Sequence, residues 1–284
     1  MPSSPQAAPS ELLTLVHPDG TRLGAELIRG SGEGFAVFGA ATGVRMGYYR
    51  PLAEWLVETR GISALLFDYR GLGASSPGQL VGYSAGFRQW AADLALAVDH
   101  AADRGPTVVI GHSFGGQAFG MTPAHARTRG LYAFGLGAGW HGWMRRLEAL
   151  KVWSMWHLVS PPLLAVAGFA PMSLLGMGED LPLGVFRDWK RWCNLPHYFF
   201  DDPEAEFTGE FGRVQVPVVC VASTDDPWAP PRSVSVFVEH YPRGEVRAVD
   251  PAALGLPSIG HLGYVRPRCR PLWEELGAWV DRRL

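Results

Sequence analysis

The sequence predicts an α/β protein with a mostly parallel central sheet flanked by helices. Short, almost wholly apolar runs alternate with segments of helical periodicity, as is typical of parallel strands buried on both faces. The chain has 284 residues, 47% of them apolar and 18% charged, which suits one globular core. Residues 137–212 hold no clear strand and interrupt the alternation. We interpret them as a helical cap inserted into a core made by residues 11–136 and 213–284.

The first elements follow from turn residues and periodicity. Residues 12–16 and 22–27 flank the turn-forming segment His17–Gly20, which predicts a hairpin. An apolar run at 35–38 predicts the next strand. Apolar residues at helical spacing over 48–59 predict a helix that ends before a glycine.

The rest of the core repeats these two patterns. They predict strands at 62–67, 107–110, 131–136, 217–222 and 245–249, and helices at 86–103, from residue 114, and at 272–280.

Composition excludes several classes of protein. A net charge of −2 offers no basic face for nucleic acid and no polybasic membrane anchor. The three cysteines lack disulfide-scaffold or zinc-site spacing, so neither a metal nor another cofactor is expected. Residues 1–10 are rich in Pro, Ser and Ala without the pattern of a signal peptide, and are expected to be a disordered tail. A cytoplasmic location is the simplest expectation.

One uncharged stretch, residues 158–177, is as long as a membrane-spanning helix. Pro161, Pro162, Gly168 and Pro171 interrupt it, and a spanning helix would be broken there. Short, buried helices of the cap are therefore expected.

The motif that carries most information is Gly111–Gly116, with the pattern G-x-S-x-G. An apolar strand precedes it and a helix-compatible run follows, so Ser113 is expected on a sharp strand-to-helix turn with its hydroxyl exposed. Side chains at Gly111 and Gly115 would crowd such a turn. A glycine-rich turn that binds phosphate is the alternative interpretation.

A serine hydroxyl needs a base to become a nucleophile, and a carboxylate to orient that base. Asp226, just past the strand at 217–222, is preferred over Asp225 as the acid, and one of the two is expected only to cap a turn. His261, in a glycine-flanked loop after the last strand, is the expected base. The order Ser, Asp, His matches that of nucleophile-elbow enzymes.

An oxyanion hole requires two backbone N–H donors. The amide of Phe114 is the first. The second is expected from the loop at 39–44, where Thr42 is the best candidate and Ala41 the alternative.

These motifs resemble those of α/β-hydrolases. Phe67–Ser75 is similar to their D-x-R-G-x-G-x-S loop, and Gly111–Gly116 to their elbow. The chain most resembles uncharacterised bacterial hydrolases described as serine aminopeptidase-like or lysophospholipase-like, whose cap pattern is similar to Gly178–Val185 and the residues after it. The resemblance covers nearly all of the chain after the first ten residues. It implies the α/β-hydrolase fold.

Carried over to this sequence, the resemblance implies Ser113 as nucleophile, Asp226 as acid and His261 as base. The chain departs from the family where alanines at Ala40-Ala41 replace the usual His-Gly pair, which affects the register of the oxyanion hole.

The sequence therefore predicts a serine hydrolase that cleaves an ester, thioester or amide. An acyltransferase or cyclase with the same triad, and a non-catalytic ligand-binding protein on the same fold, are the alternatives. Four tryptophans are candidates for binding an apolar acyl or aromatic group of a small-molecule substrate: Trp140, Trp143, Trp189 and Trp228. No nucleic acid and no stable membrane anchor are expected as partners, and the sequence leaves open whether the chain forms a homodimer.

Overall fold

The computed structural model describes residues 9–284. Its strands are β1 (Ser10–Val16), β2 (Arg22–Ile28), β3 (Phe35–Gly39), β4 (Ser63–Phe67), β5 (Thr107–His112), β6 (Leu131–Phe134), β7 (Val218–Ser223) and β8 (Gly244–Val249). Its α-helices are α1 (Arg50–Arg60), α2 (Phe87–Ala102), α3 (Phe114–Gln117), α4 (Arg146–Ser154), α5 (Ser160–Ala167), α6 (Leu183–Cys193), α7 (Pro231–Val238) and α8 (Arg270–Asp281). Short 3-10 turns connect many of these elements.

All the strands form one sheet in the order β1-β2-β4-β3-β5-β6-β7-β8. β2 runs antiparallel to β1 and β4, and every other pair is parallel. The expected mostly parallel sheet is therefore confirmed, and so is the hairpin at its edge. Strands β4 to β7 are buried along their whole length because helices cover both faces.

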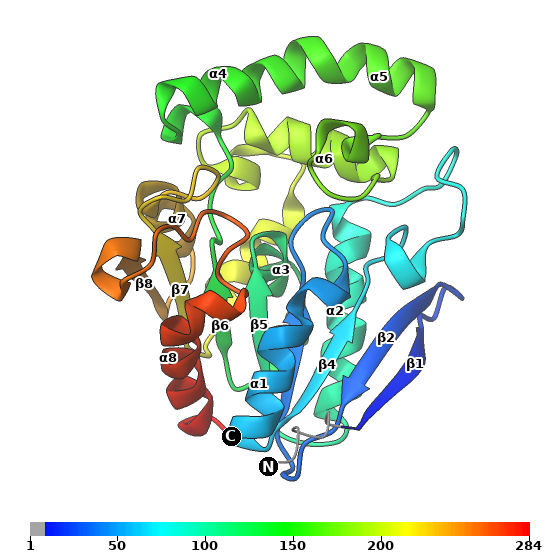
Figure 1. Ribbon diagram of the computed structural model, residues 1–284. Coiled ribbons are helices and arrows are strands. Elements are labelled where there is room, and N and C mark those ends of the chain that lie inside the picture. The colour runs from blue at the N-terminus through cyan, green and yellow to red at the C-terminus, as the bar shows by residue number, and fades with distance from the viewer. Residues whose placement is uncertain (1–8) are drawn as a thin grey trace, which may run out of the picture.

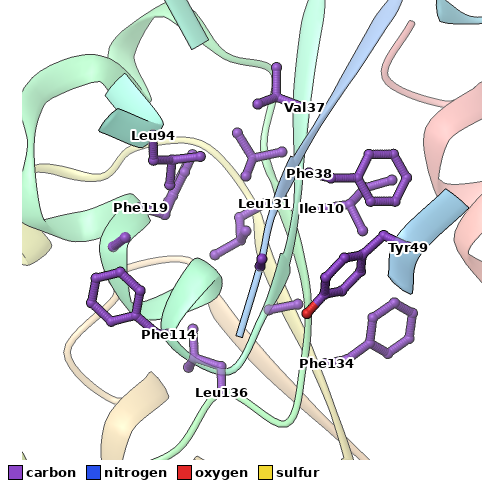
Figure 2. Close-up of a cluster of buried hydrophobic side chains, with 14 of the residues drawn as sticks. Val37, Phe38, Tyr49, Leu94, Ile110, Phe114, Phe119, Leu131, Phe134 and Leu136 are labelled. Carbon is purple, nitrogen blue, oxygen red and sulfur yellow. The ribbon is translucent and has the colours of Figure 1, made fainter. Parts of the chain in front are cut away.

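The core lies on both sides of the central strands. Figure 2 shows Leu94 of α2 and Phe114 of α3 on one side, with Tyr49 and Phe134 on the other. All four side chains are at most 2% exposed. The parallel strands carry their carboxyl ends to the same edge, so the loops that follow them meet there.

Most element boundaries agree with the sequence within two residues. The helix after Ser113 is shorter than expected, because α3 gives way to a 3-10 turn at Ala118–Met121. Its glycines favour helix poorly. The expected tail over residues 1–10 lies mostly outside the described residues, and Ser10 already belongs to β1.

Residues 137–212, hereafter the insertion, lie between β6 and β7. In Figure 1 its helices α4, α5 and α6 are stacked beyond the edge of the sheet that is furthest from the two termini. A π-helical turn, Met155–Val159, joins α4 to α5. Pro161 and Pro162 stand in the first turn of α5, and Pro171 precedes the 3-10 turn Met172–Leu175. Within residues 9–284 no helix is long and apolar enough to cross a bilayer.

Candidate active site

Ser113 stands at the tip of a strained turn between β5 and α3. Its φ is +51° and its ψ is −116°, a conformation that side chains other than glycine rarely adopt. The turn requires glycines, because the backbone segments around Ser113 approach one another too closely to leave room for a Cβ atom. A Cβ on Gly115 would lie 1.9 Å from the carbonyl oxygen of Gly39, and one on Gly111 would lie 2.6 Å from Cα of Gly116. The glycines thus have the role expected from the sequence.

Ser113 and His261 line the same cavity, which has a volume of about 340 Å³. Loops that follow the parallel strands form its floor, and the insertion contributes to its wall through Met177 and Trp189. Among residues 9–284, its lining includes no Asp, Glu, Lys or Arg side chain.

Asp226 and His261 are directly hydrogen-bonded. Nδ1 of His261 lies 2.9 Å from Oδ2 and 3.0 Å from Oδ1 of Asp226. The bond leaves Nε2 of the ring pointing away from the carboxylate. Gly135, with a φ of +56°, makes room for the pair, since a Cβ there would lie 3.0 Å from Oδ2 of Asp226 and 3.3 Å from Nδ1 of His261. Gly135 and His261 both line the cavity with Ser113.

The Asp226 carboxylate is fully buried and richly hydrogen-bonded. It accepts from the backbone N–H groups of Trp228 and Ala229 at 2.9 Å and from the hydroxyl of Tyr264 at 2.9 Å. Burial acts to raise the pKa of Asp226, but the charge of His261 and these hydrogen bonds outweigh it and hold the pKa below its usual value. The group therefore stays ionised, as the orienting acid of a triad must.

Asp225 has a different partner. Its carboxylate accepts hydrogen bonds from the backbone N–H groups of Ile259 and Gly260 at 2.9 Å, and from the Ser223 hydroxyl at 2.6 Å. It therefore fastens the loop that carries His261 and does not reach the ring itself. Asp226 thus holds the imidazole ring of His261, and its neighbour Asp225 holds the loop that carries His261.

Of the two candidate donors in the loop after β3, Ala41 and Thr42, only one amide is free among residues 9–284. The Ala41 N–H donates to the Tyr49 hydroxyl at 2.8 Å, so it is already engaged. Within the described chain, neither the Thr42 N–H nor the Phe114 N–H donates to another protein group. Thr42 and Ser113 both line the cavity. This arrangement favours Thr42 over Ala41 as the second donor.

His112 connects this loop to the loop of His261. Its Nε2 lies 2.8 Å from the His261 carbonyl oxygen, and its Nδ1 lies 2.9 Å from the Tyr49 hydroxyl. Because a carbonyl can only accept, Nε2 carries the proton and Nδ1 accepts from Tyr49, which in turn accepts from Ala41. Burial, together with the nearby charge of His261, lowers the pKa of His112 to about 3, so the ring is neutral. A buried relay thus joins two loops of the site.

The four candidate tryptophans fall into two pairs. Trp189 and Trp228 line the cavity with ring centroids 5.4 Å apart. Trp140 and Trp143 are not among its lining residues. They pack on each other at 5.1 Å, and the Trp143 indole donates to the Pro196 carbonyl oxygen. The structure therefore brings only the first pair to Ser113.

Several lining residues were not predicted from the sequence, among them Tyr198 and Gln117. Tyr198 has a φ of +58°, and in the described chain it is the only residue besides Ser113 and the glycines with positive φ. Gln117 donates to the Gly137 carbonyl oxygen at 2.8 Å, and its buried Oε1 has no partner among the described residues. Gln117 could have been found as the residue one helical turn after Ser113. No local signal marks Tyr198.

Comparisons with known proteins agree with this fold. Residues 42–135 match the sequence model of the family "Serine aminopeptidase, S33". A soluble variant of monoglyceride lipase from Saccharomyces cerevisiae has a similar structure, with a TM-score of 0.72 and 16% identity over 99% of this chain and 98% of that one. An esterase from Pyrococcus furiosus has a TM-score of 0.65 and 15% identity over 97% and 93%. Alpha/beta hydrolase domain-containing protein 10 from mouse has a TM-score of 0.62 and 16% identity over 96% and 99%.

No curated protein sequence matches the chain significantly. The sheet order, the turn at Ser113 and the structural neighbours define an α/β-hydrolase-fold protein. Within that fold, the chain resembles the S33 serine aminopeptidase family over residues 42–135, which confirms the resemblance inferred from its motifs.

Proposed function

We propose that this chain is a serine hydrolase that cleaves an ester, thioester or amide through an acyl-enzyme on Ser113. The observation that carries the proposal is the hydrogen-bonded pair of His261 and Asp226 on the cavity that Ser113 lines. The similarity to esterases and a lipase supports a hydrolase in general terms.

In the proposed reaction, the Ser113 oxygen attacks the substrate carbonyl carbon while Nε2 of His261 takes the hydroxyl proton. Asp226 stabilises the imidazolium that forms and holds its tautomer. The N–H groups of Phe114 and Thr42 bind the oxyanion of the tetrahedral intermediate. Collapse breaks the bond to the leaving group, which receives the proton from His261. Water, deprotonated by the same ring, then opens the acyl-enzyme and releases the acid.

The cavity favours a neutral substrate. An aminopeptidase must bind a free α-ammonium group, and a carboxylate is the natural partner for that cation. The lining supplies no such group within the described chain, whereas Met177, Trp189 and Trp228 offer apolar surface. We therefore propose an ester with an apolar acyl or aromatic group as the preferred small-molecule substrate.

We also propose that the insertion acts as a cap. It contributes Met177 and Trp189 to the wall beside Ser113, so its packing sets which acyl groups fit.

The test is a panel of p-nitrophenyl esters of graded chain length, with matching amides, assayed with the wild type, Ser113→Ala and Ser84→Ala. The last removes an exposed serine outside the cavity. We expect Ser113→Ala to lower kcat/KM by at least about 10³-fold and Ser84→Ala to change nothing. Circular dichroism checks that both variants fold. Undiminished turnover by a folded Ser113→Ala variant would reject the proposal.

The same assay addresses transfer to another acceptor. Product analysis with and without an added alcohol should find the free acid as the main product. A dominant ester product would make the enzyme an acyltransferase.

A further inference from the structure

The outward side of the helices α4 and α5 is apolar although nothing in the described chain covers it. Together with the π-helical turn between them, they form one continuous rod from residue 146 to residue 167. Most of the large apolar side chains that the structure exposes lie on this rod, namely Leu147, Leu150, Trp153, Leu158, Val159 and Val166. Val166 is 91% exposed and Leu147 is 74% exposed. We call these side chains the outer face.

The rod already has a partner on its other side. Trp156 is fully buried, and its ring lies 5.2 Å from that of Phe186 and 5.1 Å from that of Trp189, both on α6. In Figure 1 the rod lies along the end of the molecule, with α6 beneath it and no element beyond it. Packing of the insertion therefore accounts for the inner side chains and leaves the outer face unexplained. Contiguous exposed apolar surface of this kind marks an interaction site.

The charges beside the outer face are positive. Arg145 and Arg146, at the start of the rod, are exposed and form no ion pair within the described chain. Lys151 is paired with Glu148 at 2.8 Å. From residue 158 to residue 177 there is no charge at all. The local balance is thus basic in a chain whose net charge is −2.

We propose that the outer face docks reversibly on the surface of a bilayer that contains anionic phospholipid. A helix that lies in the plane of a membrane buries Leu, Val and Trp side chains among the acyl chains and holds Arg and Lys at the headgroups. The rod shows this distribution. A second copy of the chain fits less well, because two such faces would bring together cations and apolar groups but supply no unpaired carboxylate.

Docking would bring the site close to those of the proposed esters whose apolar acyl groups partition into the bilayer. The segment that follows the rod contributes Gly176, Met177 and Gly178 to the cavity of Ser113. This consequence depends on the proposed function, whereas the docking itself does not. The test therefore measures binding and activity separately.

The experiment is flotation of the full chain with vesicles of phosphatidylcholine alone or mixed with phosphatidylglycerol. We expect the wild type to float with the mixed vesicles and at least tenfold less with phosphatidylcholine alone. The double variant Leu150→Glu/Val166→Glu should lose at least tenfold in vesicle binding, because two apolar anchors become anions. Leu12→Glu is the matched control. Leu12 is 79% exposed but lies on β1, outside the outer face, so this substitution should leave vesicle binding unchanged.

Arg145→Gln/Arg146→Gln should reduce the preference for phosphatidylglycerol several-fold. All three variants should hydrolyse a short water-soluble ester as the wild type does, which shows that the site is intact whichever way binding turns out. Wild-type protein that floats with neither vesicle would overturn the proposal, and so would equal loss in Leu12→Glu. Sedimentation that finds a dimer dissociated by the double variant, without vesicle binding, would assign the outer face to a second copy instead.

Discussion

At the rim of the sheet, the polar groups that hold His261 and its loop are buried and hydrogen-bonded, whereas the insertion above them turns large apolar side chains outward. Asp226 is 3% exposed and accepts hydrogen bonds from the His261 ring, the Tyr264 hydroxyl and two backbone N–H groups, while Val166 on α5 is 91% exposed. Buried polar networks fix geometry because an unpaired member is costly. On the proposed function, the rim carries out the chemistry and the insertion controls access and contact. Changes at the rim should affect every substrate, and changes in the insertion should affect the choice among substrates.

The largest effect is expected when each of the two neighbouring aspartates is replaced separately. Asp226→Asn should lower kcat by about 10³-fold to 10⁴-fold because the ring loses its orienting charge. Asp225→Asn should lower kcat by less than about tenfold, since it only weakens hydrogen bonds to the Ile259–Gly260 loop, at a cost of about 1–2 kcal/mol of stability. Steady-state kinetics and urea unfolding of both variants measure the two quantities. Equal losses of kcat would remove the distinction.

The relay beneath the site should show a smaller effect. Tyr49→Phe leaves the Ala41 N–H and Nδ1 of His112 without partners, which should cost about 1–3 kcal/mol of unfolding free energy. We expect kcat to fall about tenfold with little change in KM, because the relay positions groups used in the transition state. A purely structural role would lower stability and leave the kcat of the folded enzyme as it is.

The smallest effect on kcat is expected in the insertion. Trp189→Ala removes one wall of the cavity and should shift the ratio of kcat/KM between a long-chain and an acetyl ester by about tenfold, with kcat for the acetyl ester nearly unchanged. Trp143→Ala is the matched control, since Trp143 does not line the cavity. The same shift in both variants would show that the insertion acts as a whole and not through its lining.

The sequence predicted the core well because its signals are local. Strands β4 to β7 are wholly buried and read as apolar runs. The G-x-S-x-G motif, together with the apolar strand before it and the helix-compatible run after it, places Ser113 at the turn. The preference for Asp226 over Asp225 rested on the Asp-x-x-x-Pro spacing to Pro230, which puts Asp226 deeper in the turn. In the structure, the two differ in which carboxylate bonds to the imidazole of His261. This depends on the position of the loop that carries His261, which is far from both aspartates in the sequence.

Other features depend on contacts that no local pattern encodes. Thr42 is favoured over Ala41 as the second oxyanion donor because the Ala41 N–H already donates to the Tyr49 hydroxyl. In the insertion, Trp140 and Trp189 look alike in sequence, and only the path of the chain decides which one reaches the cavity. Helical periodicity also cannot tell an inner face from an outer one where both are apolar, as along α4 and α5.

The central claim is that the hydroxyl of Ser113 is activated by His261, and covalent labelling tests it most directly. The wild type, Ser113→Ala and His261→Ala are treated with a fluorophosphonate, and the modified peptide is identified by mass spectrometry. We predict a single adduct on Ser113 of the wild type, none on Ser113→Ala, and labelling at least about 10²-fold slower on His261→Ala. Wild-type protein that stays unlabelled, or that carries the adduct on another residue, would contradict the claim.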